Sequence, residues 1–160
     1  MAQIKRSIDA PVSVDELKNH LHLYNYDFDS NLDMNIRAAV AKAESYINAH
    51  IWQVEQRVSV PFALKTTVAN DVTDVADVEV DGQAVNFTYD LGVVTVEDMQ
   101  GGKVLSYTAI MGYSNENCPA DIKMAILLIA AKFFNNPVDS VENLPSASQA
   151  LLHPYKNYCI

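Results

Sequence analysis

The sequence predicts an α+β protein in which helices from the two ends of the chain form a bundle and an antiparallel β meander is inserted between them. Two observations carry this prediction. Apolar residues recur every three or four positions in residues 1–52 and again in 114–160, a spacing typical of amphipathic helices. Between them, in residues 53–113, short valine-rich segments alternate with turns that contain glycine, which is typical of antiparallel strands.

The first zone, residues 1–52, is predicted to hold two helices. Ser13 and Glu16 have the spacing of a capping box, in which each side chain bonds the backbone amide of the other at a helix start. A longer helix follows Ser30, a second candidate N-cap, and reaches Trp52. Its apolar positions share one alanine-rich face: Leu32, Ile36, Ala39, Val40, Ala43, Tyr46 and Ile47.

The second zone, residues 53–113, is predicted to be the β meander. Valines alternate with polar residues from Val54 until Pro61 interrupts them. Asp81-Gly82 is a strong hairpin signal because both residue types tolerate positive φ. The strands expected around that turn and the two glycine-containing turns after it are 75–80, 84–89, 93–96 and 104–111.

The third zone, residues 114–160, is predicted to be helical again. Pro119 lies near a helix start, where its fixed φ is favourable, and Asn135-Asn136-Pro137 ends that helix. A short last helix runs from Ala147 to Leu152, and His153-Pro154 stops it. The first of these helices has a wide apolar face, which predicts a place in the core or against another subunit: Ile122, Ala125, Ile126, Leu127, Leu128, Ile129, Ala130, Phe133 and Phe134.

Composition points to one domain of ordinary size spanning residues 1–160. Hydrophobic residues make up 49% of the 160, enough for a core without metals or disulfides. The two cysteines, Cys118 and Cys159, have no CxxC partners and are predicted to be reduced thiols in a cytoplasm. No apolar run approaches the ~20 residues of a membrane span, so we expect no membrane association.

Charge and motifs argue against several classes of function. With 11 basic and 20 acidic residues, the net charge of −9 disfavours a surface that wraps nucleic acid, although DNA passing nearby is compatible with it. All five glycines lie at strand turns or strand ends, so none forms a phosphate-binding loop. His20 and His22 do not share a helical face, and no other metal-ligand spacing accompanies them. We therefore expect no catalytic residues, no cofactor and no metal.

The C-terminal segment from Leu151 to Ile160 is too apolar to hang free in water. It must dock on its own core or on another chain, and the sequence leaves both options open. We expect removal of residues from Leu151 onward to damage assembly more than folding of the monomer; outright unfolding would instead assign the segment to the core.

Three stretches in order resemble the small head-tail connector, or adaptor, proteins of tailed bacteriophages. The first is VSVDELKNHL (12–21), followed by an acidic loop and AKAESYI (41–47). The second is the strand YTAIMGY (107–113) with the helix PADIKMAILLIAA (119–131). The third is Leu144-Pro145 with ALLHPYK (150–156), where Lys156 replaces the family's usual arginine. The meander is also longer than in the mainly helical members.

This resemblance implies a structural subunit without a catalytic site. It implies a homo-oligomeric ring of about twelve copies beneath the portal of the virion, with a stopper or tail protein below. Phage DNA would pass through the channel without sequence-specific binding. The protein would reside at the head–tail interface of the virion, and in the host cytoplasm during assembly. The candidate interface residues are Leu127, Phe133, Phe134, Leu151, Leu152, Pro154, Tyr155 and Lys156.

The alternative is a cytosolic binding module for a small ligand or a peptide. Its strand meander would then offer a pocket or an open sheet edge to the ligand.

Overall fold

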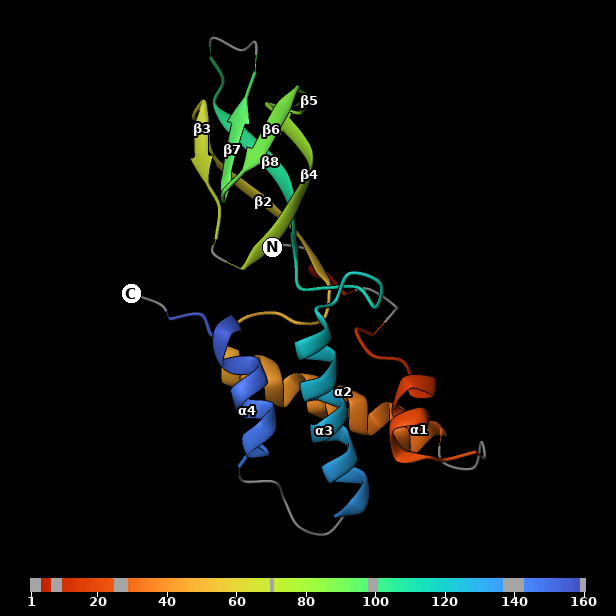
Figure 1. The fold of residues 1–160 in the computed structure, drawn as a ribbon. Coiled ribbons are helices and arrows are strands. Elements are labelled where there is room, and N and C mark those ends of the chain that lie inside the picture. The colour runs from red at the N-terminus through yellow and green to blue at the C-terminus, as the bar shows by residue number, and fades with distance from the viewer. Residues whose placement is uncertain are drawn as a thin grey trace. The chain divides into compact units, whose positions relative to one another are not determined.

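A computed structural model of the chain describes residues 4–6, 10–24, 29–69, 71–97, 101–136 and 143–158 (Figure 1). The chain divides into two compact units. We call them the strand unit, Met1–Ser7 with Gln53–Gly112, and the helical unit, Ile8–Trp52 with Tyr113–Ile160. The α+β class predicted from the sequence is confirmed, and the assignment of 1–160 to a single domain stays a prediction.

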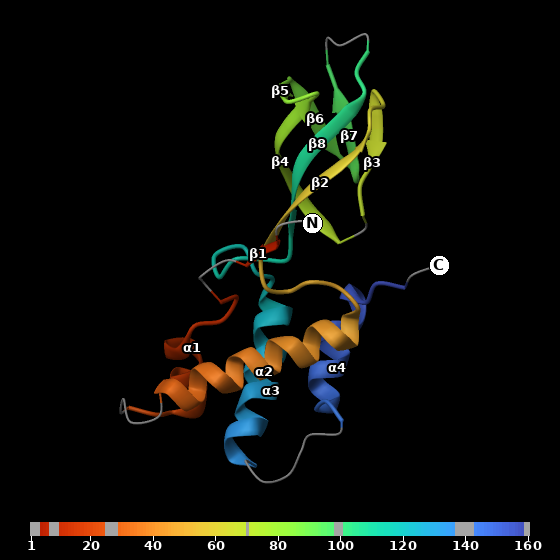
Figure 2. The same ribbon diagram turned by 180° about the vertical axis from the view of Figure 1, so that it is seen from behind.

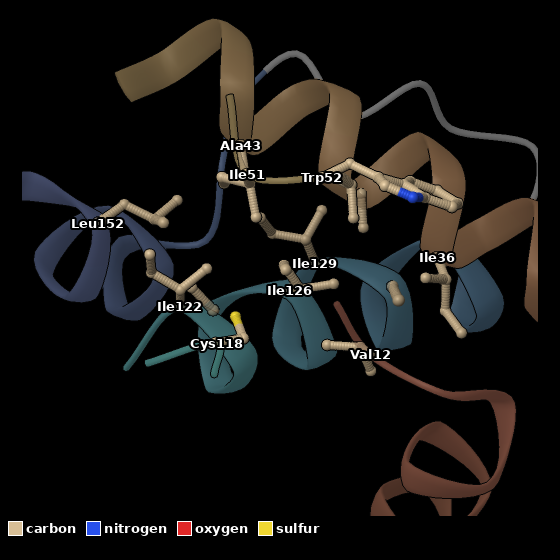
Figure 3. Close-up of a cluster of buried hydrophobic side chains, with 14 of the residues drawn as sticks. Val12, Ile36, Ala43, Ile51, Trp52, Cys118, Ile122, Ile126, Ile129 and Leu152 are labelled. Carbon is tan, nitrogen blue, oxygen red and sulfur yellow. The ribbon is translucent and has the colours of Figure 1, made fainter. Parts of the chain in front are cut away.

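The helical unit is a small bundle whose central member is α3. Its elements are α1 (Val14–Leu21), α2 (Asp29–Ile47), α3 (Ala120–Asn135), α4 (Ser146–Leu152) and the 3₁₀ turn η1 (His153–Tyr155). α3 contacts α1, α2 and α4, and α2 crosses it, as the two opposite views in Figures 1 and 2 show. Large aliphatic side chains from the four α-helices form the core and are at most 2% exposed: Leu17, Leu32, Ile36, Ile47, Ile122, Ile126, Ile129 and Leu152. Figure 3 shows Ile36, Ile122, Ile126, Ile129 and Leu152 in this cluster.

Local chemistry explains the start of α1 and the extension of the last helix. The predicted capping box starts α1: Ser13 N donates to Glu16 Oε2 over 2.7 Å, and Glu16 N donates to Ser13 Oγ over 3.1 Å. At the other end of the bundle, the last helix continues past Leu152 as η1, so His153-Pro154 tightens the helix instead of stopping it.

The prediction that α2 extends to Trp52 is wrong. The helix ends at Ile47, because Asn48 takes a left-handed conformation with φ of 55°, which is how helices commonly terminate. The Glu44 carboxylate then accepts hydrogen bonds from the backbone amides of Ile51 and Trp52, both 2.9 Å long. Trp52 remains a core residue, as expected of it, at 2% exposure.

The strand unit contains two antiparallel sheets around a core made largely of valine. The elements are β1 (Ile4–Arg6), β2 (Val54–Pro61), β3 (Lys65–Thr67), β4 (Val72–Val80), β5 (Gln83–Ala84), β6 (Phe87–Asp90), β7 (Val93–Val96) and β8 (Val104–Met111). One sheet has the order β1-β2-β8-β4-β5 and the other β3-β7-β6. The buried core includes Val75, Val78, Val80, Val94, Val96 and Leu105.

The strand order differs from a simple meander in three ways. β8 returns to lie between β2 and β4, a long-range pairing that turn signals do not encode. The return strand expected at 84–89 is split, because β5 ends at Ala84 and β6 joins the other sheet. β1 was not expected in the helical first zone; it is three residues long and exists through its pairing with β2.

Candidate assembly surfaces

Glu16 joins the start of α1 to the start of α3 through a polar clamp. Besides its capping-box bond, its carboxylate accepts from Asn115 Nδ2 over 2.8 Å and pairs with Lys123 Nζ over 3.0 Å. Asn115 Nδ2 also donates to the carbonyl of Pro11. These contacts fix α1, the loop before α3 and the first turn of α3 as one rigid corner of the helical unit.

The electrostatics of this clamp favour an ionised Glu16. Partial burial alone would raise its pKa, but hydrogen bonds from the Ser13 amide, Lys123 and Asn115 and the charge of Lys123 outweigh burial. The pKa of Glu16 falls from an ordinary 4.5 to about 2. The carboxylate is therefore a structural anchor, fully charged at neutral pH, and is unsuited to proton transfer there.

α3 has two apolar faces, and only one of them is used by the core. Ile122, Ala125, Ile126, Ile129 and Ala130 are buried. Met124, Leu128 and Ala131 lie on the opposite side at helical spacing, where Met124 is 44% exposed and the other two are half-buried. We call Met124, Leu128 and Ala131 the α3 outer patch. It contains no charge, and an uncharged apolar patch on a helix is a feature of association surfaces.

The C-terminal segment docks on its own helical unit. Leu152 is fully buried, and Tyr155 packs against the same core. Asn157 N donates to the carbonyl of Ile47 over 2.6 Å, which satisfies a group at the end of α2. Lys156 Nζ lies 4.9 Å from the ring centre of Tyr46, within the range of a cation–π contact. Of the two options that the sequence left open, the segment thus takes the first and docks on its own core.

The eight candidate interface residues fall into three classes of accessibility, all within the helical unit. Leu152 is part of the core and offers no surface to a partner in this conformation. Pro154 alone is exposed. The other six are half-buried along α3, α4 and η1 and just beyond it: Leu127, Phe133, Phe134, Leu151, Tyr155 and Lys156. Their role in an interface stays a prediction.

The described part of the chain holds neither a metal-binding cluster nor an activated thiol. No group of three or more His, Cys, Asp or Glu side chains there is placed to hold a metal ion. Cys118 is a buried free thiol, and burial raises its pKa to about 11, so it is a poor nucleophile at neutral pH. Cys159 lies outside the described residues. None of the described helices is both long and apolar enough to span a membrane.

The fold of this chain is similar to that of chains in solved structures, although its sequence matches no family profile and no curated protein is significantly similar to it. Chains in three structures share its fold over nearly their whole length, covering 99% of this chain and 97% of the other. They come from the virion of a native gene transfer agent particle (TM-score 0.67, 17% identity), the neck of the native particle with C12 symmetry (0.66, 17%) and the neck of the empty particle with C6 symmetry (0.62, 19%).

The chain shares its fold with chains in structures of the neck and the virion of a gene transfer agent particle. Because the match covers 99% of this chain, it includes the strand unit as well as the helical unit. At 17–19% identity, the likeness to the neck structures concerns the fold alone.

The α3 outer patch was only partly visible in the sequence. Leu128 stood out as part of a wide apolar face, but Met124 and Ala131 did not. The signal that could have found them is the spacing 124, 128, 131, which repeats on the side of the helix away from the isoleucines.

Proposed function

We propose that this protein is a structural subunit of the neck of a tailed-phage-like particle, a connector that forms a ring of about twelve copies. The ring sits at the head–tail junction beneath the portal, contacts a stopper or tail protein below, and surrounds the path of the DNA. The role requires no catalytic site, cofactor or metal. The proposal rests above all on the fold match to chains from neck structures over 99% of this chain.

A second line of support comes from where the family-like sequence stretches lie. VSVDELKNHL contains α1, PADIKMAILLIAA contains most of α3, and ALLHPYK covers the end of α4 and η1. The helical parts of all three stretches therefore belong to the helical unit and pack around its core, whereas the strand YTAIMGY of the second stretch lies mostly in β8 of the strand unit. Three separate matches that converge on one packed unit are stronger support than three unrelated helices would be.

Charge is consistent with a channel through which DNA passes without being held. The chain carries 20 acidic and 11 basic residues, and the bases Lys18, Arg37, Arg57 and Lys123 are engaged in ion pairs with carboxylates of the same chain. Acidic side chains outnumber basic ones, so DNA would be repelled weakly along its path.

Portal binding tests this proposal directly. The full chain is mixed with the portal ring encoded beside it, and the complex is isolated by size and imaged by electron microscopy. The proposal predicts a ring of the chain on one end of the portal, and no binding to a portal from an unrelated particle as the matched control. If the chain does not bind its own portal, the connector role is refuted and the binding-module alternative is favoured.

A further inference from the structure

The outer side of α2 is a second surface that the core does not use. Met34, Ala38, Ala41 and Ser45 are all exposed and repeat at spacings of four, three and four, so they form one line along the helix. We call these four residues the α2 outer stripe. Three of them are small, and none is charged. In a chain with a net charge of −9, an exposed helix face free of charge over three turns is unusual.

The α2 outer stripe and the α3 outer patch point in opposite directions. α2 and α3 pack on each other through buried residues such as Ile36, Ala43 and Ile126, and each surface lies on the far side of its own helix from that contact. Figure 1 shows α3 in front of α2, and Figure 2, turned by 180°, shows α2 in front. The helical unit thus has one uncharged face on each of two opposite sides.

The two faces are complementary in size and in charge. Met124 and Leu128 are large side chains, whereas Ala38, Ala41 and Ser45 leave a shallow surface that lets another helix approach closely. Lys42 borders the α2 outer stripe, and the exposed Asp121 borders the α3 outer patch. The described residues give neither Lys42 nor Asp121 an ion-pair partner within the chain, so opposite charges are available at the two margins.

We propose that the α3 outer patch of one copy packs on the α2 outer stripe of the next copy, with Asp121 of the first near Lys42 of the second. The occupant of each face is therefore a second copy of this chain. Such a contact joins two different surfaces, and repeating it gives a ring when the rotation between neighbouring copies closes, whereas a surface that meets itself gives only a two-fold dimer. This inference rests on the proposed ring-forming function and names the contact that builds the ring.

Cysteine cross-linking in assembled particles tests the contact. The double variant Ala41→Cys/Leu128→Cys, in a Cys159→Ser background, replaces the wild-type chain during particle production; buried Cys118 stays as it is. A short bis-maleimide reagent tolerates a register offset of about one helical turn, ~5 Å. Purified particles are treated and the chain is resolved on denaturing gels. The expected result is a ladder from dimer to the full ring.

Matched controls separate the possible arrangements. Ala41→Cys alone or Leu128→Cys alone should give no dimer, since each face meets a different face. Ala41→Cys/Ala150→Cys uses the exposed Ala150 of α4 instead of Leu128 and should give at least tenfold less cross-linked product. A dimer from either single variant, or equal ladders from both double variants, would overturn the head-to-tail contact.

A second measurement covers the case in which cysteine chemistry fails. Ala41→Arg and Leu128→Arg should each leave the circular dichroism of the purified chain unchanged and lower its copy number in particles at least tenfold, while Ala150→Arg incorporates normally. Normal incorporation of both arginine variants would refute the contact. If the wild-type chain itself is absent from purified particles, the proposed neck function fails, and that outcome is distinct from a missing ladder in particles that contain the chain.

Discussion

The two units of this protein differ in how they use their apolar residues. The strand unit puts valines from two sheets into a closed interior, and its exposed apolar residues lie singly, such as Leu91 at the β6–β7 turn. The helical unit fills its core with large aliphatic residues and still leaves apolar or uncharged faces on α2 and α3. From this comparison we predict that other chains dock on the helical unit and not on the strand unit.

The largest expected effect concerns the C-terminal segment. Removing residues 151–160 deletes the fully buried Leu152 and the bond from Asn157 to Ile47, and we expect the helical unit to lose about 4 kcal/mol or more of its free energy of unfolding. In NMR spectra, amide signals from the strand unit should stay well dispersed, whereas those from the helical unit should show the narrow dispersion of an unfolded chain. The docking of this segment on its own core favours damage to folding, whereas the sequence-based expectation was that assembly would suffer more.

A control deletion starts at Tyr158, which is 60% exposed, and should cost under ~1 kcal/mol. If the chain lacking 151–160 folded normally, the segment would belong to an interface and its docking on the core would be unimportant.

Core truncations in the two units sharpen the comparison. Ile126→Ala in α3 and Leu105→Ala in β8 each remove a side chain that is 0% exposed, and each should cost about 2–5 kcal/mol. In denaturant unfolding followed by hydrogen exchange, Ile126→Ala should weaken protection of the helices and Leu105→Ala that of the strands. Equal loss of protection in both units for either variant would show that the two cores unfold as one.

Glu16 gives the helical unit a pH dependence of predictable sign. Because its pKa is lowered from 4.5 to about 2, the clamp contributes fully above pH 4.5 and its contribution is lost as pH falls toward 2. Glu16→Gln should cost about 1–2 kcal/mol at pH 7, a value reduced for solvent screening because the side chain is 35% exposed. Thermal unfolding of the wild type and of Glu16→Gln between pH 7 and pH 2 measures this difference in stability.

The neighbouring Asp15→Asn, at an exposed position of the same helix turn, is the matched control and should change stability little at any pH. A Glu16→Gln variant as stable as the wild type at pH 7 would contradict the clamp.

The smallest effect is expected on the surface of the strand unit. Arg57 pairs with Glu79 over 2.6 Å and donates to the carbonyl of Asp77, but both side chains of the pair are about one-third exposed, at 34% and 38%. Exposed pairs contribute little, so Arg57→Ala should cost under ~1 kcal/mol in chemical unfolding. A much larger loss would mean that the strand unit depends on its polar face as well as on its valine core.

Sequence reasoning succeeded where a structural feature is encoded locally. The capping box fixed the start of α1, and the run from Val104 to Met111 matches β8 at both ends. The turn at Asp81-Gly82 joins β4 to β5 as expected, with positive φ at both residues. In each case a few neighbouring residues determine the backbone conformation.

Sequence reasoning failed where pairing between segments far apart in the chain determines the structure. β1 is a strand only because residues 4–6 pair with 54–56, and β8 finds its place between β2 and β4 across the sequence. The end of α2 was encoded locally, by Asn48, but an asparagine in a left-handed conformation is a weaker signal than glycine. For the candidate surfaces, spacing identified apolar residues such as Leu152 and Leu128, but only tertiary packing showed that Leu152 of α4 is buried and that Leu128 of α3 is half-buried.

The central claim, that this chain is a ring-forming neck subunit, is tested most directly by cryo-electron microscopy of particles made by the cell that encodes it. The account predicts a ring of about twelve copies between portal and tail, with density into which both units of this chain fit. A neck resolved to side-chain detail that contains no copy of this chain would contradict it.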